Sequence, residues 1–157
     1  MSKSSYDNAW DIIDWEKDTQ EEVLKKTKNL IETGANPNTA NENGLTPLMY
    51  AVEKNYVDIT RTLIAGGADV NAKDKVGNTA LMRMGLLSCF GIYPNADIVK
   101  ELIENGANTK VKNIRGRKAI NYPKKSDIRD LIRNARPDPV KLILNYVQKA
   151  HNNKQYE

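Results

Sequence analysis

The 157-residue sequence predicts an all-α solenoid built from helix–turn–helix–hairpin units. Three observations favour this fold class: two glycine ladders, recurring helix start signals, and apolar stripes at helical spacing. The first ladder opens Gly-Ala-Asx triplets at Gly34, Gly67 and Gly106. The second ladder consists of Gly44, Gly77 and Gly116. Both ladders step by 33 and then by 39 residues, which indicates an internal repeat with a six-residue insertion between residues 77 and 106.

The N-terminal segment is predicted to cover the open core of the first repeat. Its apolar residues at i, i+4 and i+7 are Tyr6, Trp10 and Ile13. Trp15 cannot share their face and is expected at the surface. The next helix begins with a capping box formed by Thr19 and Glu22. Its apolar stripe ends at the first ladder glycine and consists of Val23, Leu24, Leu30 and Ile31.

The central repeats begin with the same helix start signal. Thr46 is a predicted N-cap and Pro47 takes the first helical position, and Thr79 repeats the cap without the proline. A turn is expected at Asn55-Tyr56, because Asn tolerates the left-handed conformation. The second helices of the two repeats carry matching stripes, Ile59, Leu63 and Ile64, then Ile98, Leu102 and Ile103.

The C-terminal part predicts a shortened last repeat and one further helix. Pro123 interrupts that repeat, and its second helix, near residues 126–134, carries Ile128, Leu131 and Ile132. Asp138-Pro139 then begins a helix with an apolar stripe of Val140, Ile143, Leu144 and Val147. We expect this helix to dock on the last repeat. A membrane-surface or partner-binding helix is the alternative, although only Lys141 and Lys149 flank the stripe.

Two segments resemble the ankyrin-repeat family: GLTPLMYAVEKNYVDITRTLIAGGADVNAKD, and GNTALM followed by DIVKELIENGANTKVKN. The resemblance covers about residues 19–134 and implies a single domain over 1–157, with about four repeats of which the outer two are degenerate. The expected units are an N-terminal capping repeat at 1–36, repeats at 37–69 and 70–108, a degenerate repeat at 109–136, and a C-terminal helix and tail at 137–157. Met49 and Met82 replace the family's usual His. The family's His usually hydrogen-bonds between repeats, so we expect its loss to leave the contacts between repeats looser.

The resemblance also implies a concave surface that binds a protein partner. On this sequence the hairpin tips would contribute Glu42, Asn43, Leu45, Lys73, Lys75, Val76, Asn78, Lys112, Ile114, Arg115 and Arg117. The inner helices would contribute Glu53, Lys54, Leu86 and Leu87. Ordinary solvated surface is the alternative for each of these residues. The resemblance therefore implies a non-enzymatic protein–protein interaction module.

The insertion, residues 86–94, holds the chain's one Phe and one Cys. One interpretation is a protruding apolar loop whose anchors are Phe90, Ile92 and Tyr93. In the alternative, Leu86, Leu87 and Phe90 extend the inner helix and pack against the neighbouring repeat. Cys89 is expected to be a small buried hydrophobe.

Composition excludes most catalytic chemistry. A single Cys rules out an internal disulfide, and a single His, His151, leaves little material for acid–base catalysis. The sequence contains no phosphate loop, no HExxH motif and no serine elbow. We therefore expect no enzymatic activity, no cofactor and no metal. No apolar run approaches eighteen residues, so we expect no membrane span. We also expect a monomer in the cytoplasm, or in a host cytosol if the protein is a secreted effector.

Charge is distributed unevenly along the chain. Residues 1–60 carry 6 basic and 11 acidic side chains, whereas residues 110–157 carry 13 basic and 4 acidic ones. An ordinary solvated face is the favoured interpretation of the basic end, and an acidic protein partner and nucleic acid are the alternatives. The nucleic-acid alternative rests on Lys110, Lys112, Arg115, Arg117, Lys118, Lys124 and Lys125. Tyr122 is the single aromatic residue among them, which is thin for single-strand binding. A small adaptor, an enzyme inhibitor of the immunity type and a pathogen effector remain open as biological roles.

Overall fold

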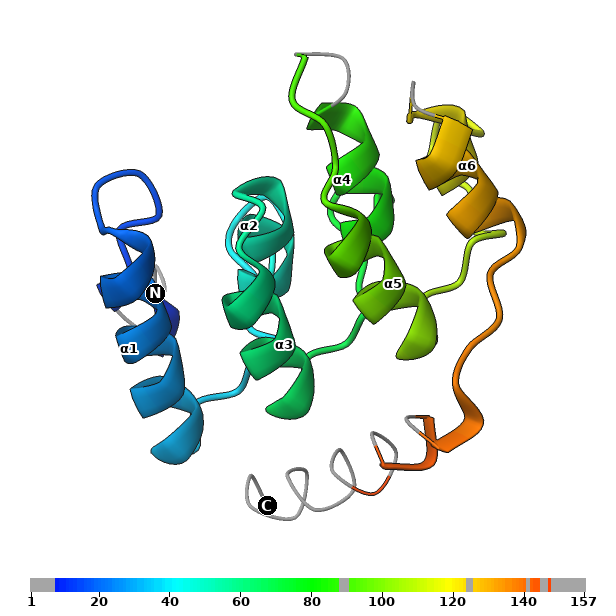
Figure 1. The fold of residues 1–157 in the computed structure, drawn as a ribbon. Coiled ribbons are helices and arrows are strands. Elements are labelled where there is room, and N and C mark those ends of the chain that lie inside the picture. Colours follow the sequence, from blue (N-terminus) through cyan, green and yellow to red (C-terminus); the bar gives the residue numbers. More distant parts are fainter. Residues whose placement is uncertain (1–7, 88–90, 124–125, 141, 145–146, 148–157) are drawn as a thin grey trace.

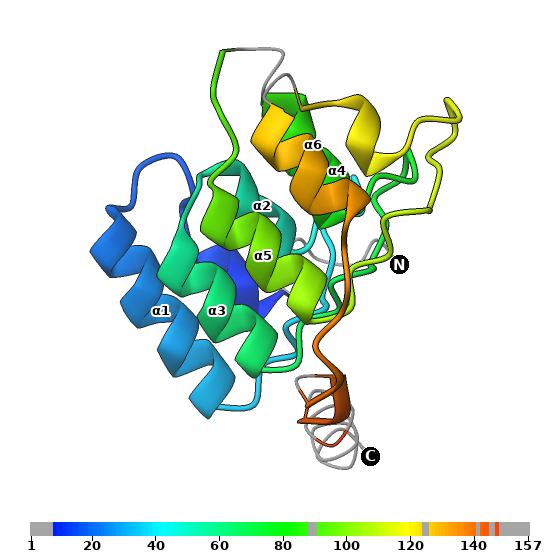
Figure 2. The same ribbon diagram turned by 45° about the vertical axis from the view of Figure 1, so that its right-hand side comes forward.

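The computed structural model describes residues 8–87, 91–123, 126–140, 142–144 and 147, and these residues form helices and loops without a strand. Two rows of helices stack side by side (Figures 1 and 2). The outer row consists of α1 (Gln20–Glu32), α3 (Val57–Ala65), α5 (Ala96–Glu104) and α6 (Ser126–Arg133). The inner row consists of the 3-10 helix η1 (Ala9–Ile12), α2 (Pro47–Glu53), α4 (Ala80–Leu87) and the 3-10 helix η3 (Ala119–Asn121). Each outer helix packs on the next, and α4 packs on both α2 and η3. The predicted all-α solenoid is confirmed.

The helix boundaries follow the predicted caps. The Thr19 hydroxyl accepts a hydrogen bond from the Glu22 N–H, and the Thr19 N–H donates to the Glu22 carboxylate. Thr46 caps α2 in the same way through the Met49 N–H, and Pro47 takes the first helical position. Asn55 adopts a left-handed φ of 58° in the turn between α2 and α3, as its place in the repeat predicts. All six ladder glycines have a positive φ, between 69° and 96°.

The insertion lies where the two glycine ladders place it. Residues 54–56 connect α2 and α3, whereas residues 88–95 separate the described end of α4 from the start of α5. α4 covers 8 described residues and α2 covers 7, and residues 88–90 of the insertion lie outside the described residues.

The core is a continuous apolar layer between the two rows. Ile59, Leu63, Ile98 and Leu102 are fully buried, and Ile128 and Ile132 of α6 are 2% and 3% exposed. At the N-terminal end Trp10 and Ile13 close this layer, with exposed fractions of 3% and 5%. Trp10 lies in the four-residue 3-10 helix η1 and Ile13 follows it directly, so this helix is shorter than the one we expected. Tyr6 lies outside the described residues.

Trp15 does not lie free at the surface as expected. It is half-buried, and its ring stacks on Tyr50 of α2 with centroids 5.2 Å apart and an angle of 12° between the planes. The stack ties the N-terminal segment to the inner row.

The prediction that the C-terminal apolar stripe docks on the last repeat is wrong for the described residues. Residues 139, 140, 142–144 and 147 are helical, yet the four stripe side chains are 59–64% exposed. After α6 the chain runs down past the end of α5 (Figure 1), where the Asp138 N–H donates to the Glu104 carbonyl at 3.1 Å. α6 and η3 close the core at this end, and these four side chains remain in solvent. Leu142 of the same helix lies against Gly106 in the turn after α5, so the helix meets the third repeat through a side chain outside the predicted stripe. In the described part of the chain no helix is long and apolar enough to cross a bilayer.

Candidate functional site

Three hairpins project from the inner row, and one side-chain oxygen organises each of them. Asn41, Asp74 and Asn113 each accept hydrogen bonds from the backbone N–H groups two and four residues ahead, at 2.8–3.0 Å. These residues form a third ladder with the spacings 33 and 39, which sequence reasoning missed. The signal was present, because each lies three residues before a glycine of the second ladder.

The hairpins are linked into one row by backbone hydrogen bonds. The Lys75 N–H donates to the Asn43 carbonyl at 3.0 Å, and the Ile114 N–H donates to the Val76 carbonyl at 3.1 Å. The contact is close: a Cβ added at Gly44 would lie 2.9 Å from the Lys75 nitrogen. The tips are therefore held in fixed positions relative to one another.

Neighbouring repeats are also bridged by side-chain amides. Asn38 donates to the Gly67 carbonyl at 3.2 Å and accepts from the Asp69 N–H at 2.6 Å. Asn71 makes the same pair with the Gly106 carbonyl and the Asn108 N–H, at 2.9 and 2.7 Å. These asparagines make polar bridges between repeats whose first helices carry the buried Met49 and Met82 in place of the family's His. The next position in this series is Lys110, which has no amide to continue it.

The predicted tip residues separate into three groups by burial. Eight are exposed: Glu42, Asn43, Lys73, Lys75, Lys112, Ile114, Arg115 and Arg117. Leu45 and Val76 are half-buried. Asn78 is 6% exposed, donates to Asp74 at 3.3 Å and accepts from Asn113 at 2.8 Å. Asn78 therefore joins two hairpins from the inside and offers no contact surface.

Each inner element holds its own hairpin through a side chain nine residues further along the chain. Asn41 donates to the Tyr50 hydroxyl at 2.9 Å, and Asn113 donates to the Tyr122 hydroxyl at 2.8 Å. The middle repeat uses an ion pair instead, with Arg83 at 2.7 Å from Asp74, whose side chain is 2% exposed. A charged pair thus lies between two neutral ones.

The two charged residues predicted on the α2 face take part in ion pairs. Glu53 pairs with Arg83 of the next repeat, and Lys54 pairs with Glu16 of the N-terminal segment at 2.8 Å. Their side chains are 24% and 30% exposed. They hold adjacent elements together and keep part of their surface open to solvent.

The insertion combines features of both interpretations. Leu86 and Leu87 are half-buried in the last turn of α4, as expected if they extend the inner helix, and Phe90 lies outside the described residues. Ile92 and Tyr93 are 48% and 53% exposed, as expected for a protruding loop. Asn55 fixes the returning chain, because its side chain bonds to the Tyr93 carbonyl and the Asn95 N–H at 3.3 and 3.2 Å.

Hydrogen bonds lower the pKa of acidic side chains in the N-terminal segment. The Lys26 ammonium lies 2.6 Å from the Asp18 carboxylate and lowers the pKa of Asp18. The Thr19 backbone N–H lowers the pKa of Glu22 in the capping box. No cluster of metal-ligating side chains occurs in the ranges that the structure describes.

Comparison with known families gives the same repeat. A family model of ankyrin repeats in three copies matches residues 19–113. The chain belongs to the ankyrin-repeat family. Ankyrin repeats generally serve as protein–protein interaction modules, so the expected class of function is supported at that level.

Individual ankyrin relatives match part of the chain. An ankyrin repeat-containing protein of Schizosaccharomyces pombe, P1E11.10, is 33% identical over 84 residues, which are 53% of this chain and 36% of that protein. The B-cell lymphoma 3 protein homolog of Mus musculus is 30% identical over 105 residues, 66% of this chain and 22% of that protein. The chain therefore spans about a third or less of the length of these curated relatives.

A solved structure shares the fold. The crystal structure of the ankyrin repeat domain of Bcl-3, described as a unique member of the IkappaB protein family, superimposes with a TM-score of 0.61. The match covers 73% of this chain and 50% of that one, at 23% identity. Identity at this level shows the fold alone.

Proposed function

We propose that this ankyrin-repeat protein binds an acidic surface of a protein partner through its third hairpin. Ile114 at the hairpin tip carries the proposal: it is 75% exposed, more than any other large apolar side chain in the described ranges. Lys112, Arg115 and Arg117 surround it, and all three are exposed. An apolar anchor inside a basic rim matches an apolar pocket with an acidic rim on the partner.

Hydrogen bonds hold the third hairpin in an ordered conformation before any partner binds. Asn113 accepts from the backbone N–H groups of Arg115 and Arg117, and Ile114 is bonded to the second hairpin. A surface that is already ordered loses little conformational entropy on association. Such a surface acts by covering part of its partner, which is compatible with the role of an adaptor, an inhibitor or an effector.

Nucleic acid is the second candidate ligand. The burial of the one aromatic ring among the basic side chains favours a protein ligand over a nucleic acid. Tyr122, the aromatic residue among the basic side chains, is 7% exposed and bonded to Asn113. Its ring is not available for a base to stack on, and stacking platforms are typical of single-strand binders.

The test is affinity capture with the full chain from lysate of the source organism and from a eukaryotic lysate, followed by mass spectrometry. The variant R115E/R117E should lose the partner and keep its melting temperature, because both side chains are exposed. The matched control, K25E/K28E, makes the same charge change on exposed positions of α1 in the outer row. It should keep the partner.

Three outcomes discriminate the alternatives. Equal capture by R115E/R117E and wild type would contradict the hairpin proposal. Retention on heparin or DNA that vanishes at moderate salt, with no protein captured, would favour nucleic acid. Loss of the partner from a variant with Ser at Phe90, Ile92 and Tyr93, but not from R115E/R117E, would assign the contact to the insertion.

A further inference from the structure

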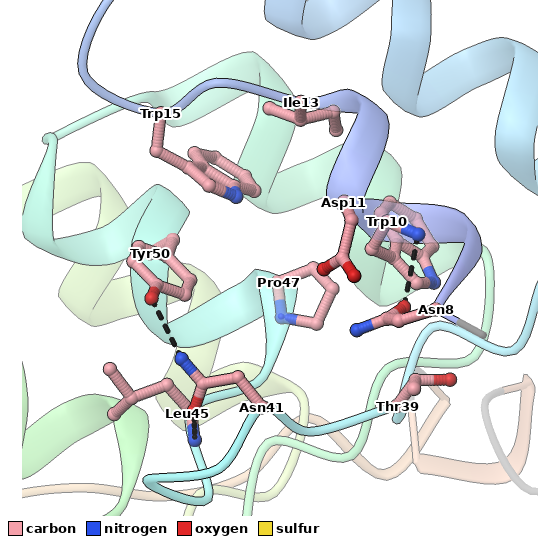
Figure 3. Close-up of a pocket in the computed structure, with 10 residues that line it drawn as sticks. All are labelled: Asn8, Trp10, Asp11, Ile13, Trp15, Thr39, Asn41, Leu45, Pro47 and Tyr50. Carbon is pink, nitrogen blue, oxygen red and sulfur yellow. Dashed lines mark hydrogen bonds between the residues drawn. The ribbon is translucent and has the colours of Figure 1, made fainter. Parts of the chain in front are cut away.

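A pocket of about 200 Å³ lies at the opposite end of the inner face, between the N-terminal segment and the first hairpin (Figure 3). Trp10, Trp15, Leu45, Pro47 and Tyr50 supply its apolar walls. Asp11 of η1 lies between these walls, and its carboxylate points toward the middle of the ring of lining residues in Figure 3. The pocket thus combines one carboxylate with aromatic rings, and the hairpin proposal does not use it.

The aromatic walls are held in place. The Trp10 indole N–H donates to the Asn36 carbonyl at 2.7 Å, and its ring is buried in the core. The Tyr50 hydroxyl accepts from Asn41, and the opposite side of the pocket is built from Trp15 stacked on the Tyr50 ring. A ligand would therefore enter a preformed site.

Asp11 has no partner among the described residues. The three other acidic side chains between residues 8 and 18 each pair with a lysine: Asp14 with Lys17, Glu16 with Lys54, and Asp18 with Lys26. The Asp11 side chain makes no hydrogen bond or ion pair in the same part of the structure. Its charge is open to a cation that enters the pocket.

Size and chemistry together select the occupant. Pockets for small molecules measure roughly 300–1,000 Å³, so a pocket of this volume suits one anchoring side chain. Arginine fits the lining best, because its planar guanidinium bonds a carboxylate in bidentate fashion and stacks on aromatic rings. Its aliphatic stem can pack on apolar walls such as Pro47 and Leu45.

We propose that this pocket binds the arginine side chain of an extended segment of a protein partner. The proposal rests on the proposed function in one respect, that the ligand belongs to a protein. It uses separate residues, at the acidic end of the chain and not at the basic third hairpin. The two proposals can therefore fail independently.

The test uses defined peptides and the two tryptophans of the chain, both of which line the pocket. The probe is the blocked peptide acetyl-Gly-Gly-Arg-Gly-Gly-amide, titrated while the indole N–H signals are followed by NMR. The comparison peptide carries citrulline, which keeps the shape of arginine and lacks its charge. We expect saturable indole shifts with the arginine peptide and about fivefold weaker binding of the citrulline peptide.

Two variants locate the effect. Asp11→Asn should weaken the arginine peptide by about five- to tenfold and remove its advantage over citrulline. Asp11 is exposed, so this variant should fold and melt like wild type. Glu32→Gln is the matched control, an exposed carboxylate at the end of α1 that should leave binding unchanged. R115E/R117E should also leave it unchanged.

The proposal is overturned by any of three results. The first is an absence of indole shifts with the arginine peptide. The second is equal affinity for arginine and citrulline, or equal loss in Asp11→Asn and Glu32→Gln. The third is self-association of the wild type that Asp11→Asn abolishes, because the occupant would then be a second copy. If the arginine peptide binds but affinity capture yields no protein partner, the pocket proposal is supported and the hairpin proposal is refuted.

Discussion

The two ends of the solenoid are closed in different ways. At the N-terminal end Trp10 of the four-residue 3-10 helix and Ile13 directly after it are buried in the core, and the Trp10 indole N–H donates to the Asn36 carbonyl of the first repeat. At the C-terminal end α6 and η3 close the core with Ile128 and Ile132, and the helix beyond them leaves its apolar stripe in solvent. An apolar stripe thus predicts a helix, but it does not by itself establish that the helix docks on the core.

The largest expected effect belongs to the N-terminal end. Trp10→Ala removes a buried aromatic ring and its hydrogen bond, and it should lower the free energy of unfolding by about 3–5 kcal/mol. Urea unfolding followed by circular dichroism measures this loss. A change below about 1 kcal/mol would mean that the solenoid does not need this cap, and the contrast between its ends would disappear.

The second effect concerns the bridges between repeats. Asn71→Ala should cost about 1–2 kcal/mol, because it leaves the Gly106 carbonyl and the Asn108 N–H without their partner. Lys110→Ala, at the equivalent position one repeat later, should cost less than about 0.5 kcal/mol. The same unfolding experiment measures both variants. Equal costs would show that the C-terminal joint is bridged as firmly as the central one.

Acid should weaken the N-terminal end through Asp18 and Glu22. Both carboxyls have a folded pKa below the usual value, so their stabilising contribution is complete above that value. It declines as the pH falls below about 4 and through the lowered folded pKa. Tryptophan fluorescence reports this end, because both tryptophans lie there. Lys26→Met should flatten the profile, since the Lys26 ammonium is the largest cause of the lowered pKa of Asp18. An unchanged profile would refute this role.

The smallest effect is expected at the C-terminal end. Replacing the exposed Val140, Ile143 and Leu144 by Ser should change the free energy of unfolding by less than about 0.5 kcal/mol. A thermal melt beside that of Trp10→Ala provides the comparison. A loss of several kcal/mol would mean that the stripe is buried in solution and that the two ends are closed alike.

Much of the candidate binding surface could be predicted from the sequence, because its framework is local. The glycine ladders located all three hairpins, and eight of the eleven predicted tip residues are exposed. The Asx ladder at Asn41, Asp74 and Asn113 could have been found from spacing alone. The burial of Asn78 could not, because its partner Asn113 lies 35 residues away in the next hairpin.

The amino-acid sequence was sufficient for the period, the caps, the turn at Asn55 and the buried stripes, since each depends on residues within about one helical turn. Three features required the folded chain: the amide bridges of Asn38 and Asn71, the pocket around Asp11, and the exposed C-terminal stripe. Each depends on which distant segments meet and on how much apolar surface the others leave uncovered. Local periodicity does not say which distant segments meet or which apolar side chains stay exposed, because packing between repeats determines both.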